Sequence, residues 1–106
     1  MKLDMQGIMK QAQKVQEEME KVKKEIQMKT VTAESGGGLV RVVMTGNNEL
    51  IELKISKEIV NPDDIEMLED LIVASVNNAT QNVALMANEE MQKVTGMLPN
   101  IPGLSF

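Results

Sequence analysis

The chain has 106 residues, a net charge of −5, and neither cysteine nor histidine. That length fits one small domain, and the two missing residue types exclude a disulfide framework, a cysteine-based metal or redox site, and the commonest general base. No apolar run is long enough to cross a membrane, and the first residues lack the apolar core of a signal peptide. We therefore expect a cytoplasmic protein without membrane contact.

The charge is distributed unevenly along the chain. Residues 1–29 hold seven lysines against five acids, whereas residues 30–106 hold four bases against eleven acids. An acidic chain is not the usual nucleic-acid binder. A role in nucleic-acid binding would have to depend mainly on the first segment.

An apolar stripe begins the chain, with alternating spacings of three and four residues. This heptad pattern predicts a helix from about residue 2 to residue 28, roughly 40 Å long. Opposite charges four residues apart, such as Lys14–Glu18 and Glu17–Lys21, are expected to support it. The methionines in the stripe also suit an adaptable binding groove, but the spacing favours packing against another helix. The stripe consists of Met5, Ile8, Ala12, Val15, Met19, Val22 and Ile26.

The apolar period then changes to two, which predicts strands at residues 30–34, 39–45 and 50–56. In the third strand, apolar and charged residues alternate, so we expect one buried face, formed by Ile51, Leu53 and Ile55. Glycine and asparagine residues between the strands suit hairpin turns, which need residues that tolerate a positive φ.

The run Gly36–Gly38 also raises the question of a phosphate-binding loop. Such a loop is followed by Lys-Ser/Thr at the start of a helix, so that backbone amides and the helix dipole meet the phosphate. Here the strand LVRVV follows the glycines. The context therefore favours a turn.

A second long helix is predicted after the strands, ending near Val94. Asn61 suits its N-cap, Pro62 its first position, and Gly96 its end. Residues 97–106 contain proline and glycine and are expected to form a tail outside a single domain of residues 1–96.

Three acids near the start of this helix, Asp63, Asp64 and Glu66, are also candidate ligands for a divalent metal. The same residues favour a helix start through capping and the dipole, and we prefer that interpretation. Because no serine has a histidine partner, a Ser-His triad is excluded. We find no catalytic constellation and expect neither a metal nor a cofactor.

The predicted order is α-β-β-β-α, an α+β fold with a small antiparallel sheet and two long helices. Strands of about 20 Å cannot cover helices of twice that length, so the helix ends must protrude. A three-stranded sheet also leaves two open edges. Both features predict a symmetric homodimer that joins or packs its sheets and leaves helical arms projecting.

Four lysines of the first helix lie opposite its apolar stripe: Lys10, Lys14, Lys21 and Lys24. They have two interpretations. In the first, they belong to the solvated surface of a coiled coil, because neighbouring acids offset them and Glu17 interrupts the row; the pattern alone favours this. In the second, they form a row of phosphate contacts that binds DNA with little sequence preference and strong salt dependence.

Four segments together resemble a known family. They are MKQAQKVQEEMEKVKKEI (9–26), VTAESGGGLVRVVMTG (31–46), DIEMLEDLIVASVNNA (64–79) and EMQKVTGMLP (90–99). In this order, over nearly the whole chain, they are similar to the YbaB/EbfC family of bacterial nucleoid-associated proteins. The resemblance implies a tweezer-like α-β-β-β-α homodimer that binds duplex DNA through its helical arms. It also implies a nucleoid location, no enzymatic activity and no small-molecule substrate.

The sequence departs from the family pattern at two places. Family members often carry an arginine pair after the N-x-A of the last helix, where this chain has Gln81 and Asn82. Some also carry basic residues entering the third strand, where this chain has Glu49 and Leu50. Basic residues are therefore carried over only onto the first helix.

Two functional hypotheses follow. In the first, a homodimer holds duplex DNA between or along its arms through the four lysines and influences nucleoid organisation and gene expression. In the second, the chain is a coiled-coil protein-binding scaffold or prefoldin-like adaptor with weak or no DNA binding. An enzyme ranks third, because no general base with a partner is present.

Overall fold

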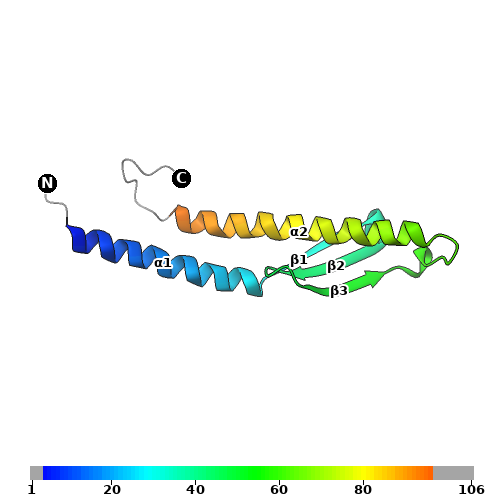
Figure 1. Ribbon diagram of the computed structural model, residues 1–106, viewed down its shortest axis with the longest axis horizontal. Helices are drawn as coiled ribbons and strands as arrows, with labels where there is room; N and C mark the ends of the chain where they lie inside the picture. The colour runs from blue at the N-terminus through cyan, green and yellow to red at the C-terminus, as the bar shows by residue number, and fades with distance from the viewer. Residues whose placement is uncertain (1–3, 97–106) are drawn as a thin grey trace.

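Two long helices and a three-stranded sheet form an elongated molecule (Figure 1). The computed structural model describes residues 4–96, so the predicted tail of residues 97–106 lies outside the described part. The elements are α1 (Met5–Met28), β1 (Thr30–Ser35), β2 (Val40–Thr45), β3 (Leu50–Ile55) and α2 (Ile65–Thr95). This is the predicted order. The radius of gyration is 20.8 Å, whereas a compact domain of about 100 residues has roughly 13 Å.

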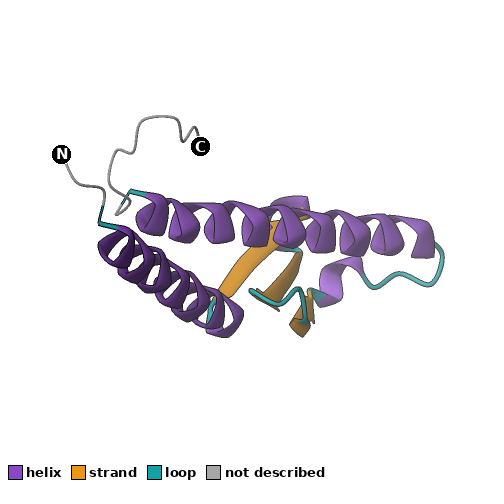
Figure 2. Cartoon of the chain, turned by 60° about the vertical axis from the view of Figure 1, so that its left-hand side comes forward, coloured by secondary structure: helices purple, strands orange, loops and turns teal. Residues whose placement is uncertain are grey.

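The strands form an antiparallel sheet in the order β1-β2-β3, with Ala33 opposite Val42 and Val42 opposite Leu53. The first half of α2 lies across β1 and β2 (Figure 2). A small core forms where they meet, and its fully buried members include Val42 and Ala79. Met44 also belongs to this core.

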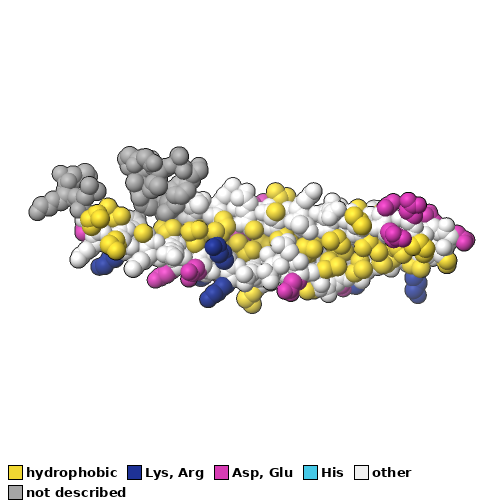
Figure 3. All heavy atoms as spheres, viewed as in Figure 1, with side chains coloured by type: hydrophobic (Ala, Val, Ile, Leu, Met, Phe, Trp, Pro, Cys, Tyr) yellow, Lys and Arg dark blue, Asp and Glu magenta, His cyan; other side chains and the backbone are white. Residues whose placement is uncertain are grey.

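The predicted buried face of β3 is mostly exposed, and of its three residues only Ile55 is half-buried. Leu53 keeps 42% of its surface exposed and Ile51 keeps 58%. The reason is geometric: α2 covers the two other strands and stops short of β3. Hydrophobic side chains consequently form a band along the boundary between α2 and the strands at the sheet end (Figure 3).

The glycine run is a turn, as predicted. It joins β1 to β2, and Gly36, Gly37 and Gly38 all have φ between 61° and 95°, a region that other residues rarely adopt. The carboxylate of Glu34 lies beside Gly38 and pairs with Arg41 at 3.0 Å. A strand and not a helix follows the glycines, so the turn lacks the helix N-terminus of a phosphate-binding loop.

The second helix starts three residues later than predicted. Asp64 is its N-cap, and its Oδ1 accepts a hydrogen bond from the Met67 amide at 3.2 Å. Asn61 instead accepts from the Asp63 amide at 3.0 Å, within a turn that precedes the helix. Asn61 as the N-cap is therefore wrong, because its side chain caps this Asx turn. Gly96 ends α2 as predicted.

The arm consists of α1 and the second half of α2, which run antiparallel (Figure 1). The heptad stripe of α1 faces α2, and its burial decreases outward, from Ile26 (7% exposed) at the base to Ile8 (47%) near the tip. At the base, the Gly46 amide donates to the Lys29 carbonyl at 2.8 Å. A Cβ at Gly46 would overlap the Ile26 carbonyl oxygen, so this position needs glycine for the close approach of α1.

Candidate nucleic-acid interface

The four candidate lysines, Lys10, Lys14, Lys21 and Lys24, are all exposed on α1. Fourteen residues separate the first from the last, which corresponds to about 21 Å along the helix. The whole of α1 has 24 residues, or about 36 Å, close to one turn of B-DNA at ~34–36 Å. The arm is therefore long enough to follow a duplex for about one turn.

The lysines of α1 differ from the other basic residues of the described chain in their ion pairing. Between residues 4 and 96, Lys29 and Lys93 pair with Glu90, while Arg41 and Lys54 pair with acids of the sheet. Six cations in this range have no ion-pair partner within 4 Å, and five of them lie on α1. The six are Lys10, Lys14, Lys21, Lys23, Lys24 and Lys57.

The predicted pairs Lys14–Glu18 and Glu17–Lys21 are not among the ion pairs of residues 4–96, so this expectation was wrong. Long side chains on an exposed helix lose conformational entropy on pairing and gain little in water. The unpaired ammonium groups remain accessible to an external anion.

Acids divide the lysine row into two groups. Glu17 and Glu20 line a shallow polar depression on α1 together with Gln13 and Gln16. Lys10 and Lys14 lie on its tip side, and the remaining lysines on its base side. Basic and acidic side chains also alternate along α1 on the face shown in Figure 3. A polyanion along this face would meet two positive groups separated by a negative one.

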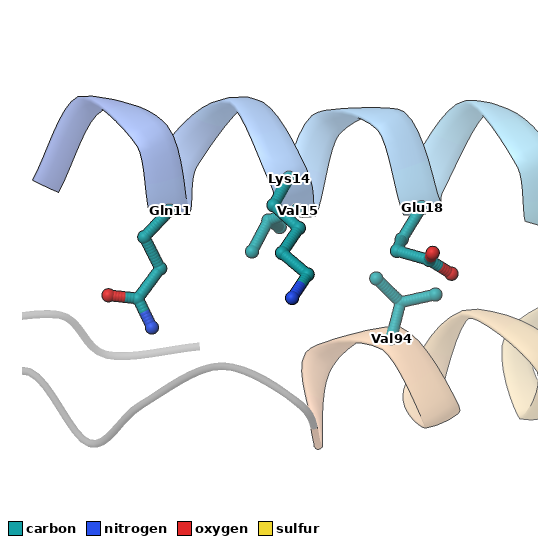
Figure 4. A pocket seen from close by; sticks show the side chains of 5 residues that line it. All are labelled: Gln11, Lys14, Val15, Glu18 and Val94. Carbon is teal, nitrogen blue, oxygen red and sulfur yellow. The ribbon is translucent and has the colours of Figure 1, made fainter. Parts of the chain in front are cut away.

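Lys14 differs from the other three in its surroundings. It lines a hollow of about 140 Å³ between the helices, together with Gln11, Val15, Glu18 and Val94 (Figure 4). Its ammonium group points from α1 toward the end of α2 in this view. The residue therefore lies at the border between the lysine face and the apolar stripe.

The base of the arm carries an ionic clamp that the sequence analysis did not identify. Glu90 Oε1 lies 2.7 Å from Lys29 Nζ and 3.1 Å from Lys93 Nζ, and the Glu90 side chain is only 14% exposed. Its hydrogen bond with Lys29, followed by that with Lys93, holds the pKa of Glu90 below its usual range. The clamp ties Lys29, the residue that follows α1, to α2.

Two of the four positions that differ from the family pattern, Asn82 and Glu49, form hydrogen bonds here. Asn82 is half-buried and donates from Nδ2 to the Thr32 carbonyl at 3.4 Å. Glu49 lies in the hairpin between β2 and β3, where its amide donates to Thr45 Oγ1 at 3.2 Å. Asn82 therefore supports the edge of the sheet. The i,i+4 pair Asn78 and Asn82 was the signal for this role.

Lys23 is a further candidate for phosphate contact that the sequence pattern did not indicate. It is exposed, unpaired within residues 4–96 and next to Lys24. The dipeptide Lys23-Lys24 was visible in the sequence, but Lys23 falls outside the lysine face of the heptad pattern. In residues 4–96, neither helix is apolar enough to span a membrane, and no three acids or other ligand side chains gather as a metal site.

Comparison with known proteins assigns the chain to a family. The model of the YbaB/EbfC DNA-binding family matches residues 1–98. The chain belongs to this family. It is not a known enzyme family; its members are nucleoid-associated DNA-binding proteins.

Similar proteins agree with the assignment. A "Nucleoid-associated protein" of Acetivibrio thermocellus is 50% identical over 98 residues, covering 92% of this chain and 87% of the relative. One of the same name from Ruminiclostridium cellulolyticum is 46% identical over 101 residues, covering 95% and 88%. The crystal structure of uncharacterized protein HP0035 from Helicobacter pylori has a TM-score of 0.71 at 19% identity, covering 89% and 99%. It supports the fold alone.

Proposed function

We propose that the protein binds duplex DNA as a homodimer through its helical arms, in the bacterial cytoplasm at the nucleoid. The observation that carries this proposal is that five of the six unpaired cations of residues 4–96 lie on α1. The phosphate contacts come from Lys10, Lys14, Lys21 and Lys24. Bound dimers would thereby influence nucleoid organisation and gene expression.

Recognition through these lysines depends on phosphates and carries little sequence information. Lysine is a flexible point charge without the planar donor geometry with which arginine reads guanine. The family places basic residues also on the last helix and near the third strand, but this chain has uncharged residues or an acid there. We therefore expect moderate affinity that depends strongly on salt.

The dimer is inferred from the uncovered apolar side of the sheet end. Leu50, Leu53, Ile65 and Met67 each keep 40–47% of their surface exposed beside the small core. A soluble protein rarely leaves a large contiguous apolar patch unless it meets a partner. A second copy related by a twofold axis would bury the same patch on both chains.

The two sheet edges differ, and the difference favours β3 for this contact. At β1, the amide groups of α2 reach the strand: Asn78 Nδ2 donates to the Glu34 carbonyl at 3.3 Å and Asn82 Nδ2 to the Thr32 carbonyl at 3.4 Å. These carbonyls are no longer free to pair with another strand. The edge at β3 has no such cover within residues 4–96, so the second copy is expected there.

A salt series tests the DNA-binding proposal. Binding of a fluorescent duplex is measured between low and physiological salt for the wild type and for a variant with all four lysines changed to Gln. With about 0.9 unit of slope per phosphate contact, we expect log K against log salt to become shallower by about 3–4 units per engaged arm.

The matched control is Lys57→Gln, which removes the one unpaired cation of residues 4–96 outside α1. It should leave the slope unchanged. Absence of binding by the wild type at low salt and micromolar dimer would refute the proposal.

The alternative function, a protein-binding scaffold or prefoldin-like adaptor, is favoured by the exposed methionines of the arm, such as Met5 and Met9. It predicts client binding that is insensitive to the four substitutions, together with no DNA retention. The same salt series therefore separates the two functions.

A further inference from the structure

Five exposed charged residues form a charged row along one side of α1. They follow one another at spacings of four, three, four and three residues, and residues at these spacings are neighbours on the surface of a helix. The row lies on the side of α1 opposite the apolar stripe, which faces α2. Its members are Lys10, Lys14, Glu17, Lys21 and Lys24.

The charges of this row have a symmetric order. Glu17 lies seven residues from Lys10 and seven from Lys24, so one carboxylate is flanked by a pair of lysines on each side. None of the five side chains forms an ion pair within residues 4–96. The alternation of positive, negative and positive charge is therefore presented to an external molecule.

The spacing of the two lysine pairs matches one groove of B-DNA. Along the helix axis, Lys14 and Lys21 are about 10.5 Å apart, and Lys10 and Lys24 are about 21 Å apart. The major groove is ~12 Å wide, which lies between these distances, whereas the minor groove is only ~6 Å wide. Because each ammonium group ends a flexible four-carbon stem, the two pairs can reach phosphates on opposite walls of the major groove.

The carboxylate favours a row that crosses a groove over a row that follows one DNA strand. Phosphate charges succeed one another every ~3.4 Å of the axis along a strand, so a row lying on a strand would bring Glu17 against a phosphate. Like charges in contact oppose binding. Across the major groove, the middle of the row instead faces base edges, where cytosine and adenine present amino donors.

We propose that α1 crosses the major groove of B-form DNA. Lys10 and Lys14 meet one phosphate wall, Lys21 and Lys24 meet the other, and Glu17 lies over the groove between them. This inference rests on the proposed function and adds to it the groove and the direction of the arm. The Lys14 ammonium group, which points toward α2 in Figure 4, turns outward to reach its phosphate.

A duplex with a filled major groove tests the crossing. Fluorescent DNA in which every cytosine carries a glucosylated 5-hydroxymethyl group has the same phosphates as the unmodified duplex of equal sequence. The C5 substituent of a pyrimidine projects into the major groove, so we expect the wild type to bind the glucosylated duplex at least about tenfold more weakly. Netropsin, which occupies the minor groove of A·T sequences, should leave binding to an A·T-rich duplex unchanged.

An exchange of charges within the row tests the spacing. The variant Glu17→Lys/Lys21→Glu keeps the net charge but places three lysines together and moves the carboxylate toward one end. We expect about fivefold weaker binding to unmodified DNA, because one phosphate contact is lost, and a smaller effect of glucosylation. The matched control Lys57→Glu/Glu58→Lys exchanges two exposed charges outside α1 and should bind like the wild type.

Three results would overturn the crossing: equal affinity of the wild type for the glucosylated and unmodified duplexes, displacement of the wild type by netropsin, or unchanged affinity in Glu17→Lys/Lys21→Glu. In each case, a shallower salt dependence in the variant that lacks the four lysines would still support DNA binding by α1. Absence of wild-type binding to the unmodified duplex at low salt would refute both the crossing and the proposed function.

Discussion

At the sheet end, two of the three basic side chains are paired and several apolar side chains remain exposed. On α1, all five lysines are unpaired within residues 4–96, around a stripe that faces α2. Arg41 pairs with Glu34 and Lys54 with Glu52, while Leu53 beside them is 42% exposed. The arm, in contrast, carries five unpaired lysines within the described chain.

This contrast supports the proposal that the two ends of one small chain have different partners. An exposed apolar surface gains free energy by being removed from water, which suits a second copy of the chain. Accessible ammonium groups gain by releasing the counterions of a polyanion, which suits DNA.

A charge introduced at the uncovered face of β3 is expected to have the largest effect, a loss of dimer affinity. Leu53→Glu would bury an unpaired carboxylate in the proposed dimer contact, and such a charge costs several kcal/mol. The dimer should therefore weaken at least about a hundredfold in sedimentation equilibrium. The control is Lys54→Gln, the next residue, on the opposite face of the strand. If the Leu53→Glu dimer is as stable as the wild-type dimer, the dimer contact does not involve this face of β3.

Removal of the acids within the lysine row should strengthen DNA binding. The double variant Glu17→Gln/Glu20→Gln joins the two positive groups of α1, and we expect about fivefold tighter binding near physiological salt. The control Glu66→Gln/Glu69→Gln changes the net charge equally but at the sheet end. If both variants gain equally, net charge rather than the row on α1 determines the affinity.

Loss of the hydrogen bond between Asn82 and the edge strand β1 should have a smaller effect, on stability. Asn82→Ala loses the hydrogen bond to the Thr32 carbonyl, which should lower the free energy of unfolding in urea by about 1 kcal/mol. It should also promote association beyond the dimer, because the strand edge becomes accessible. Asn77→Ala, whose side chain has no hydrogen bond within residues 4–96, is the control. An equal decrease in the free energy of unfolding in Asn82→Ala and Asn77→Ala would contradict a specific role for the Asn82 hydrogen bond.

The ionic clamp at Glu90 should give the smallest effect and a defined pH dependence. Because the pKa of Glu90 is lowered from the ordinary 4.5, its stabilising contribution is full above that pH and is lost as the pH falls through the lowered pKa. Glu90→Gln should therefore speed amide exchange at the base of α1 at pH 7. The exchange rates of the wild type and the variant should become equal in acid. Glu89→Gln is the neighbouring control, and a difference that persists in acid would exclude the ion pairs as its cause.

Elements with local signals were predictable from the sequence. The heptad stripe located α1, the period-two segments located the strands within one or two residues, and Gly96 ended α2. The family resemblance, also visible in the sequence, is confirmed by the match to the family model. Consistent local propensity and patterning explain this success.

Features that depend on tertiary surroundings were not predictable in this way. The alternation in β3 predicts a buried face, but α2 leaves Leu53 uncovered, because the position of α2 over the sheet is not encoded in the β3 pattern. Asn61 and Asp64 are both good caps, and the turn at Pro62 decides between them. Asn82 resembles a surface residue until the fold brings it to the Thr32 carbonyl. The lysine site itself remains a prediction.

The contact between Gly46 and Ile26 has a mechanical consequence. It lies at the base of α1, so the 24-residue helix acts as a lever whose pivot is a backbone contact. For a helix of about 36 Å, a tilt of roughly 10° displaces the tip by about 6 Å. A single methyl group added at this glycine would therefore be amplified into a displacement of the tip of α1, far from the site of substitution.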